Sequence, residues 1–283
     1  MVLESLISPY FAEKKPLMLV VVGILYASIA MFLGLWIFRD EASLIIVFLT
    51  VIACVPFMFK MLKYEENKSL KYTDEVLLIK EHSKALNYLM CLFIGFVIAF
   101  TIWYLFMPEQ FTYSVFSAQT NTINAINNQI MGHSIKTNFL SKIILNNIKV
   151  LFFCILFSFV YGAGAIFILT WNASVISVAI GNFIRNGLAD VASYVGFTKL
   201  GSYLHVVSFG VLRYMTHGIF EILAYFVGGL AGGLVSVALI RRKVDSKDFN
   251  MIMFDVCILT LIAVFILFFA GIIEVYLTPL LFN

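Results

Sequence analysis

The sequence predicts an all-α polytopic transmembrane helical bundle of about seven spans. Of its 283 residues, 62% are hydrophobic and only 12% are charged, whereas soluble domains average about 45–50% and about 25%. A soluble fold of this size could not cover so much apolar surface with so few charges. Apolar runs long enough to cross a bilayer recur along the chain, separated by short polar segments.

The first two runs predict an N-terminal transmembrane hairpin within residues 1–59. A spanning helix needs about 20 apolar residues, and Leu17–Phe38 satisfies this length. The run is too long for a signal peptide and no small-residue cleavage site follows it, so we expect a retained span. Ser43–Phe59 returns across the membrane. The highly charged residues 60–87 then form a cytoplasmic linker, and residues 88–283 form the membrane core.

Five further spans are predicted in this core. They are Tyr88–Met107, Ile148–Thr170, Trp171–Leu188, His217–Ile240 and Met251–Leu277. The fifth span of the chain, Trp171–Leu188, carries polar residues. It either crosses the membrane or is a re-entrant segment, in which case Val191–Val211 crosses instead.

Two stretches between the spans are expected on the outer side. In Pro108–Asn146, Ile123, Ile126 and Ile130 recur at helical spacing and Gly132 could end that helix. Val191–Leu212 has a similar apolar stripe. We predict amphipathic helices lying on the outer membrane face or on the bundle, with ordinary loop packing as the alternative.

The distribution of basic residues predicts the orientation. If the N-terminus, Lys60–Asn87 and Arg241–Lys243 share one side, about twelve of the 19 Lys and Arg residues gather there. By the positive-inside rule this side is the cytoplasm. We therefore expect a multi-pass protein of the cell membrane with a cytoplasmic N-terminus and an external C-terminus.

Several classes of function are disfavoured. The basic residues are dispersed and the formal net charge is only +3, so a nucleic-acid partner is not expected. No cofactor motif is present, and His82, His133 and His205 are expected to be ordinary surface residues. The four cysteines lie in apolar runs without CxxC spacing, as buried hydrophobic residues would, and they are Cys54, Cys91, Cys154 and Cys257.

A polar layer is predicted near the outer ends of several spans. His217 and Glu221 are four residues apart and therefore share a helix face, and Glu274 is a second carboxylate within an apolar run. Asn146, Asn147, Lys149 and Arg185 are predicted at the same level. Such groups either form a site for proton, ion or substrate chemistry, or clamp the helices together. A metal site is not expected, because HxxxE supplies two ligands and lacks the zincin pattern.

A glycine pattern in the sixth span predicts close helix packing. Gly228, Gly229, Gly232 and Gly233 write GxxxG twice, and Gly218 is assigned to the same role. The packing is expected within the monomer, with a homodimer face as the alternative. No catalytic nucleophile motif accompanies it, so no catalytic residue is assigned.

Three elements together resemble the stage II sporulation protein M family. They are Asn146-Asn147-Ile148-Lys149-Val150, the His217-Gly-Ile-Phe-Glu221 signature leading into the glycine-rich helix, and Glu274 before Thr278-Pro279. The resemblance covers roughly Tyr88 to Pro279, a five-span core. Thr216 stands where the family usually has Pro, and Leu17–Phe59 is an additional hairpin.

The resemblance implies a non-enzymatic membrane anchor, of the kind that localises cell-wall hydrolases in spore-forming bacteria, although a sporulation role itself does not carry over. We therefore expect a scaffold embedded in the lipid bilayer that organises membrane or cell-surface proteins. One alternative is a small-solute or ion permease or channel. Another is an intramembrane enzyme acting on a lipid-linked substrate, with His217 as base and Glu221 orienting it.

Overall fold

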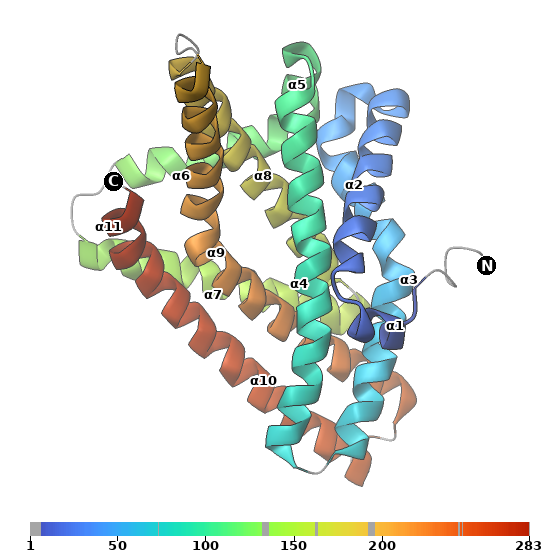
Figure 1. Cartoon of the computed structure of the whole chain (residues 1–283). Coiled ribbons are helices and arrows are strands. Elements are labelled where there is room, and N and C mark those ends of the chain that lie inside the picture. Colours follow the sequence, from blue (N-terminus) through green and yellow to red (C-terminus); the bar gives the residue numbers. More distant parts are fainter. Residues whose placement is uncertain are drawn as a thin grey trace.

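The chain folds into a bundle of helices. The computed structural model describes residues 7–72, 74–131, 136–161, 164–191, 196–242, 244 and 246–282. In this part of the chain, seven helices are long and apolar enough to cross a membrane. The all-α prediction of about seven spans is therefore confirmed (Figure 1).

The structure defines eleven α-helices within these residues. They are α1 (Pro9–Lys14), α2 (Met18–Ile37), α3 (Ala42–Lys71), α4 (Glu75–Phe106), α5 (Glu109–Val115), α6 (Ser117–Met131), α7 (Lys136–Tyr161), α8 (Ala165–Asp190), α9 (Gly196–Arg241), α10 (Lys247–Ile272) and α11 (Thr278–Phe282). A 3₁₀ turn, Arg39–Glu41, joins α2 to α3, and a π-helical turn, Ile273–Leu277, joins α10 to α11.

The N-terminal hairpin packs closely against α4. Helices α2, α3 and α4 stand side by side (Figure 1). At the crossing of α2 and α4, a Cβ atom on Gly23 would overlap the carbonyl oxygen of Leu92, and one on Gly95 would overlap that of Val20. Two glycines facing each other therefore let these backbones touch, as small residues do in membrane helix pairs.

The charged residues 60–87 lie mostly in helices. Helix α3 continues to Lys71, and α4 begins at Glu75. Asp74 caps α4, because its carboxylate accepts hydrogen bonds from the backbone N–H groups of Val76 and Leu77. The charged segment thus extends both helices beyond their apolar parts.

The predicted boundary between the fourth and fifth spans was wrong. Helix α7 ends at Tyr161, nine residues before the predicted end at Thr170, and α8 begins at Ala165, six residues before the predicted start at Trp171. The hydroxyl of Ser158 accepts a hydrogen bond from the Ala165 N–H at 3.1 Å and so caps the new helix. The break lies inside an apolar run, where hydropathy does not change. A fifth spanning helix is nevertheless present at this place, as α8.

The stretch Val191–Leu212 is helical from Gly196 onward, as predicted, but it is not separate from the sixth span. Its described residues from Gly196 onward belong to α9, whose 46 residues span about 69 Å at 1.5 Å per residue. Thr216 helps to explain the continuity, since a proline there would lose a backbone hydrogen bond and clash with the carbonyl of Leu212. Instead the Thr216 hydroxyl donates to that carbonyl at 2.6 Å. Helix α9 changes direction along its course but does not break (Figure 1).

The stretch after α4 is helical, as predicted. Helix α6 contains Ile123, Ile126 and Ile130 and runs across the long helices (Figure 1). Ile123 packs against the buried core, whereas Gly132 lies outside the described residues. The apolar residues that follow it in the sequence form the first turns of α7 rather than a second surface helix.

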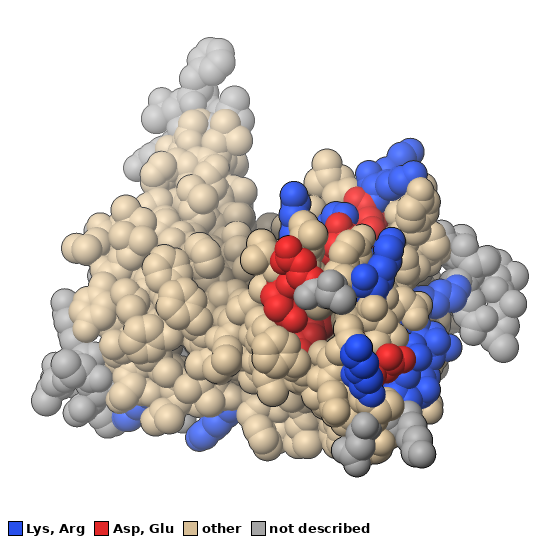
Figure 2. Space-filling view, turned by 90° about the horizontal axis from the view of Figure 1, so that it is seen from below, with Lys and Arg blue, Asp and Glu red and all other residues tan. Residues whose placement is uncertain are grey.

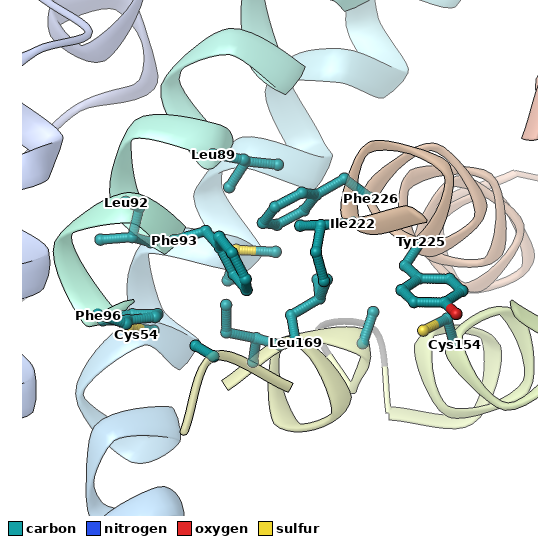
Figure 3. Close-up of a cluster of buried hydrophobic side chains, with 14 of the residues drawn as sticks. Cys54, Leu89, Leu92, Phe93, Phe96, Cys154, Leu169, Ile222, Tyr225 and Phe226 are labelled. Atoms are coloured by element: carbon teal, nitrogen blue, oxygen red, sulfur yellow. The ribbon is translucent and has the colours of Figure 1, made fainter. Parts of the chain in front are cut away.

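The core lies where α3, α4, α7, α8 and α9 meet (Figure 3). Phe93 of α4 and Phe226 of α9 make an edge-to-face contact with ring centroids 6.3 Å apart. All four cysteines are free thiols. Three are buried as predicted, but Cys257 is exposed on α10, so that part of the cysteine prediction was wrong.

Candidate functional site: a carboxyl pair joining three helices

Motif residues of α7 and α9 meet in a direct hydrogen bond. Asn147 is 7% exposed and lies on α7 where it packs on α9. Its amide Nδ2 donates to Oε1 of Glu221 at 2.6 Å. An amide that donates to a carboxyl inside apolar helices satisfies a group that would otherwise cost a few kcal/mol.

A π-helical turn brings Glu274 to the same place. Pro279 has no N–H and its ring opposes the carbonyl four residues earlier, and the chain forms the wider turn Ile273–Leu277 just before it. The carboxyl group of Glu274 lies beside that of Glu221, close enough for the two to interact directly. Two carboxyl groups in this position hydrogen-bond when one of them carries a proton, because an ionised carboxylate only accepts. Asn147, Glu221 and Glu274 will be called the carboxyl clamp.

His217 lies beside this clamp without completing a catalytic arrangement. Its Nδ1 faces the Thr278 hydroxyl at 3.4 Å, and the hydroxyl also donates to the Ile273 carbonyl at 3.2 Å. Glu221 is engaged with Asn147 and Glu274. The imidazole is therefore tied to the π-helical turn rather than oriented by Glu221.

Three residues of the predicted polar layer lie elsewhere. Asn146 is exposed on another face of α7, in a hollow between α7 and α8 that Trp171 also lines. Lys149 is exposed. Arg185 is half-buried on α8, where its guanidinium donates to the carbonyls of Tyr104 and Met107. Arg185 thus caps the C-terminus of α4.

Replacing Arg185 with alanine should destabilise this end of α4. Two carbonyls would lose a charged donor, and we expect a loss of about 1–3 kcal/mol in the free energy of unfolding. Arg185→Lys should lose less, because it retains the charge but not the planar fork. Denaturant unfolding in detergent, followed by circular dichroism, measures both. Equal stability of Arg185→Ala and wild type would refute the capping role.

The glycine pattern is used for packing inside the monomer. A Cβ on Gly232 would overlap the carbonyl oxygen of Ile155 on α7, and one on Gly233 would overlap Leu62 on α3. Gly228 and Gly229 face Leu151 and Ala165 in the same way. Gly218 differs, since a Cβ there would meet no atom within 4 Å.

A second polar cluster was missed by the sequence analysis. His82 was expected at the surface, but it is 1% exposed. Its Nδ1 lies 2.8 Å from Oε2 of Glu65, and its Nε2 lies 2.9 Å from Oδ2 of Asp255. Ser69 donates to the same Asp255 oxygen at 2.7 Å. Glu65, Ser69, His82 and Asp255 will be called the histidine cluster, and they join α3, α4 and α10.

Ion pairs surround the histidine cluster at this end of the molecule. Lys68 pairs with Glu13 of α1 and lies 3.0 Å from Glu65. The fully buried Glu66 pairs with Arg241 and Arg242. Figure 2 looks onto this end and shows the charged side chains concentrated on one side of the view. The N-terminal helix and the charged ends of α3, α4, α9 and α10 therefore lie together.

One signal could have revealed this cluster. Asp255 is a carboxylate within the apolar run Met251–Leu277, and such groups usually pair inside the bundle. Its partners come from positions 173 and 186 residues away, so no local spacing identifies them. Among the described residues, no group of three His, Cys, Asp or Glu side chains is placed to hold a metal ion.

Together, the seven apolar helices and the polar residues that bind them to one another define a polytopic α-helical membrane protein. The family model of stage II sporulation protein M matches residues 88–279, and the chain belongs to that family. This match confirms the resemblance seen in the motifs. No curated protein and no solved structure matches the chain.

Proposed function

We propose that this protein is a non-enzymatic membrane scaffold that organises partner proteins in or at the cell membrane. The observation that carries the proposal is the carboxyl clamp, whose polar groups hydrogen-bond to one another across α7, α9 and the π-helical turn. Polar side chains that hydrogen-bond to one another between helices fix the relative position of those helices. A rigid arrangement of spanning helices is what a scaffold needs in order to present a docking surface.

The surroundings of the clamp support this assignment over an enzyme. An intramembrane enzyme would use His217 as base with Glu221 orienting it, but these two side chains have other partners. Three surface hollows lie near Ser69 and Glu75, near Arg39 and near Asn146. Neither His217 nor Glu221 lines any of these three.

The orientation remains part of the proposal. The charged end, with α1 and Arg241, would face the cytoplasm under the positive-inside rule. Helices α5 and α6 would then lie on the outer side, where Tyr113 is 80% exposed. A homodimer would have to use a surface other than the glycine pattern, because Gly232 and Gly233 are covered within the chain.

Site-specific photo-crosslinking in the native host tests the scaffold. A photoreactive residue at Tyr113 should give a discrete adduct with one partner protein, and deletion of the scaffold should release that partner from its membrane location. The control is Val76, which is 76% exposed at the opposite end and should not give this adduct. Unchanged partner location after deletion would refute the scaffold.

A permease is the second candidate, favoured by one observation. Glu221 and Glu274 are carboxyl groups within apolar helices and are only half-buried by the protein. Ionisable groups inside a membrane often mark the pathway of an ion or proton. In proteoliposomes this function predicts ion flux that Glu221→Gln abolishes. The scaffold predicts no flux above empty liposomes for either protein, with an added ionophore as the positive control.

The carboxyl clamp also predicts a stability effect. Glu221→Ala should lower the free energy of unfolding by about 1–3 kcal/mol, because the Asn147 amide and the Glu274 carboxyl would lose their partner. Glu221→Gln should cost clearly less, since an amide can still accept and donate here. A melting temperature in detergent that is the same for Glu221→Ala and wild type would exclude the clamp.

A further inference from the structure

A groove lies at the end of the molecule opposite the charged cluster, between α2, α4 and α5. It has a volume of about 520 Å³ and is lined mainly by aromatic residues. Trp36, Trp103 and Phe111 form its walls, and Arg39 is the one charged residue among those that line it. Its size falls within the usual range of small-molecule sites, about 300–1,000 Å³.

The position of the groove corresponds to the lipid headgroup level. The 20 residues of α2 span about 30 Å, the thickness of the hydrocarbon core, and Arg39 follows directly after them. Helix α4 ends at the same place with Phe106. Phe106 is 82% exposed and Trp36 is 74% exposed, as residues that contact acyl chains at a membrane interface would be.

Arg39 is available to a ligand. Its guanidinium lies 4.7 Å from the ring centroid of Phe111, and within the described chain it forms no hydrogen bond or ion pair. Stacking on a ring leaves the N–H groups at the edge of the guanidinium free, and these match two oxygens of a phosphate.

The charges around Arg39 define the rest of the ligand. Asp40 and Glu41 follow it in the 3₁₀ turn, Glu109 begins the neighbouring α5, and all three are exposed. One basic and three acidic groups disfavour a headgroup with only negative charge. They complement a headgroup that carries a phosphate and an amine.

We propose that the groove between α2, α4 and α5 binds one zwitterionic phospholipid of the phosphatidylethanolamine type. Its phosphate pairs with Arg39, its ammonium group faces the surrounding carboxylates, and part of one acyl chain lies between the aromatic walls. This site is independent of the scaffold proposal, because neither the carboxyl clamp nor a protein partner takes part in it.

Tryptophan fluorescence offers a direct test in the full chain. The protein has three tryptophans, and Trp171→Phe leaves Trp36 and Trp103, which both line the groove. This variant is reconstituted in two kinds of bilayer. One contains brominated phosphatidylethanolamine in unlabelled phosphatidylglycerol, and the other contains brominated phosphatidylglycerol in unlabelled phosphatidylethanolamine. Brominated phosphatidylethanolamine should reach half-maximal quenching at a mole fraction about three- to tenfold lower than brominated phosphatidylglycerol does.

Variants at Arg39 and at one control position separate the outcomes. Arg39→Gln, made in the Trp171→Phe chain, should abolish the preference, and Arg39→Lys should retain part of it. Lys142→Gln removes an exposed basic residue of α7, outside the groove, and should leave the preference intact. Equal quenching by the two lipids in the parent chain, or a preference that survives Arg39→Gln while circular dichroism shows native helix content, would overturn the proposal.

Discussion

Replacing His82 with alanine should lower the free energy of unfolding by about 3–5 kcal/mol, the usual cost of removing one partner from a buried ionic group. Both ring nitrogens face a carboxylate oxygen, at 2.8 Å from Glu65 and 2.9 Å from Asp255. Only an imidazolium donates from both nitrogens. Without the ring, Asp255 would keep only the Ser69 hydroxyl as a donor, and Glu65 would keep Lys68.

Two further variants make this prediction specific. Lys84→Ala removes an ion pair with Glu81 from the same helix, but that lysine side chain is 45% exposed, so the change should be within about 0.5 kcal/mol. The triple variant His82→Leu, Glu65→Gln and Asp255→Asn should recover part of the lost stability, because the uncompensated charges are gone. Urea unfolding in detergent micelles, followed by helix content, measures all three.

The size of the His82 effect bears on how the chain is assembled. The family match begins at residue 88, so the N-terminal hairpin lies outside it. The histidine cluster and the pairs from Glu66 to Arg241 and Arg242 join α3 of this hairpin to α9 and α10 of the matched core. A His82→Ala protein as stable as wild type would show that the cluster does not contribute to holding the two parts together.

Replacing Gly232 with alanine should cost about 1–3 kcal/mol, as overpacking of a close-packed core does. The added Cβ would overlap the carbonyl oxygen of Ile155, which belongs to the backbone of α7 and cannot rotate away. Helices α7 and α9 would therefore have to separate. Their separation would also lengthen the hydrogen bond from Asn147 to Glu221.

Gly218 is the matched control in the same helix. A Cβ at this position meets no atom within 4 Å, so Gly218→Ala should leave stability unchanged or raise it by about 0.5–1 kcal/mol through helix propensity. Thermal unfolding of both variants in one detergent compares them directly. Equal effects of the two substitutions would contradict close packing at Gly232.

The sequence alone determined the class of this protein and its family. Apolar runs of about 20 residues report membrane spans directly, because the bilayer thickness fixes the length of a spanning helix. The motifs around Asn147, Glu221 and Glu274 indicated the family. The match of the family model to residues 88–279 confirms it. The internal position of Glu221 and Glu274 also predicted partners, since an unpaired carboxylate is costly in hydrocarbon.

Only the tertiary structure decided which polar residues meet. Asn146 and Asn147 are adjacent in the sequence, yet only Asn147 faces Glu221, because consecutive helical residues point about 100° apart. Arg185 was grouped with them but caps α4 instead. The sequence also did not predict the end of α7 at Tyr161 or the burial of His82. Hydropathy records how apolar a segment is, whereas these features depend on which distant residue packs beside it.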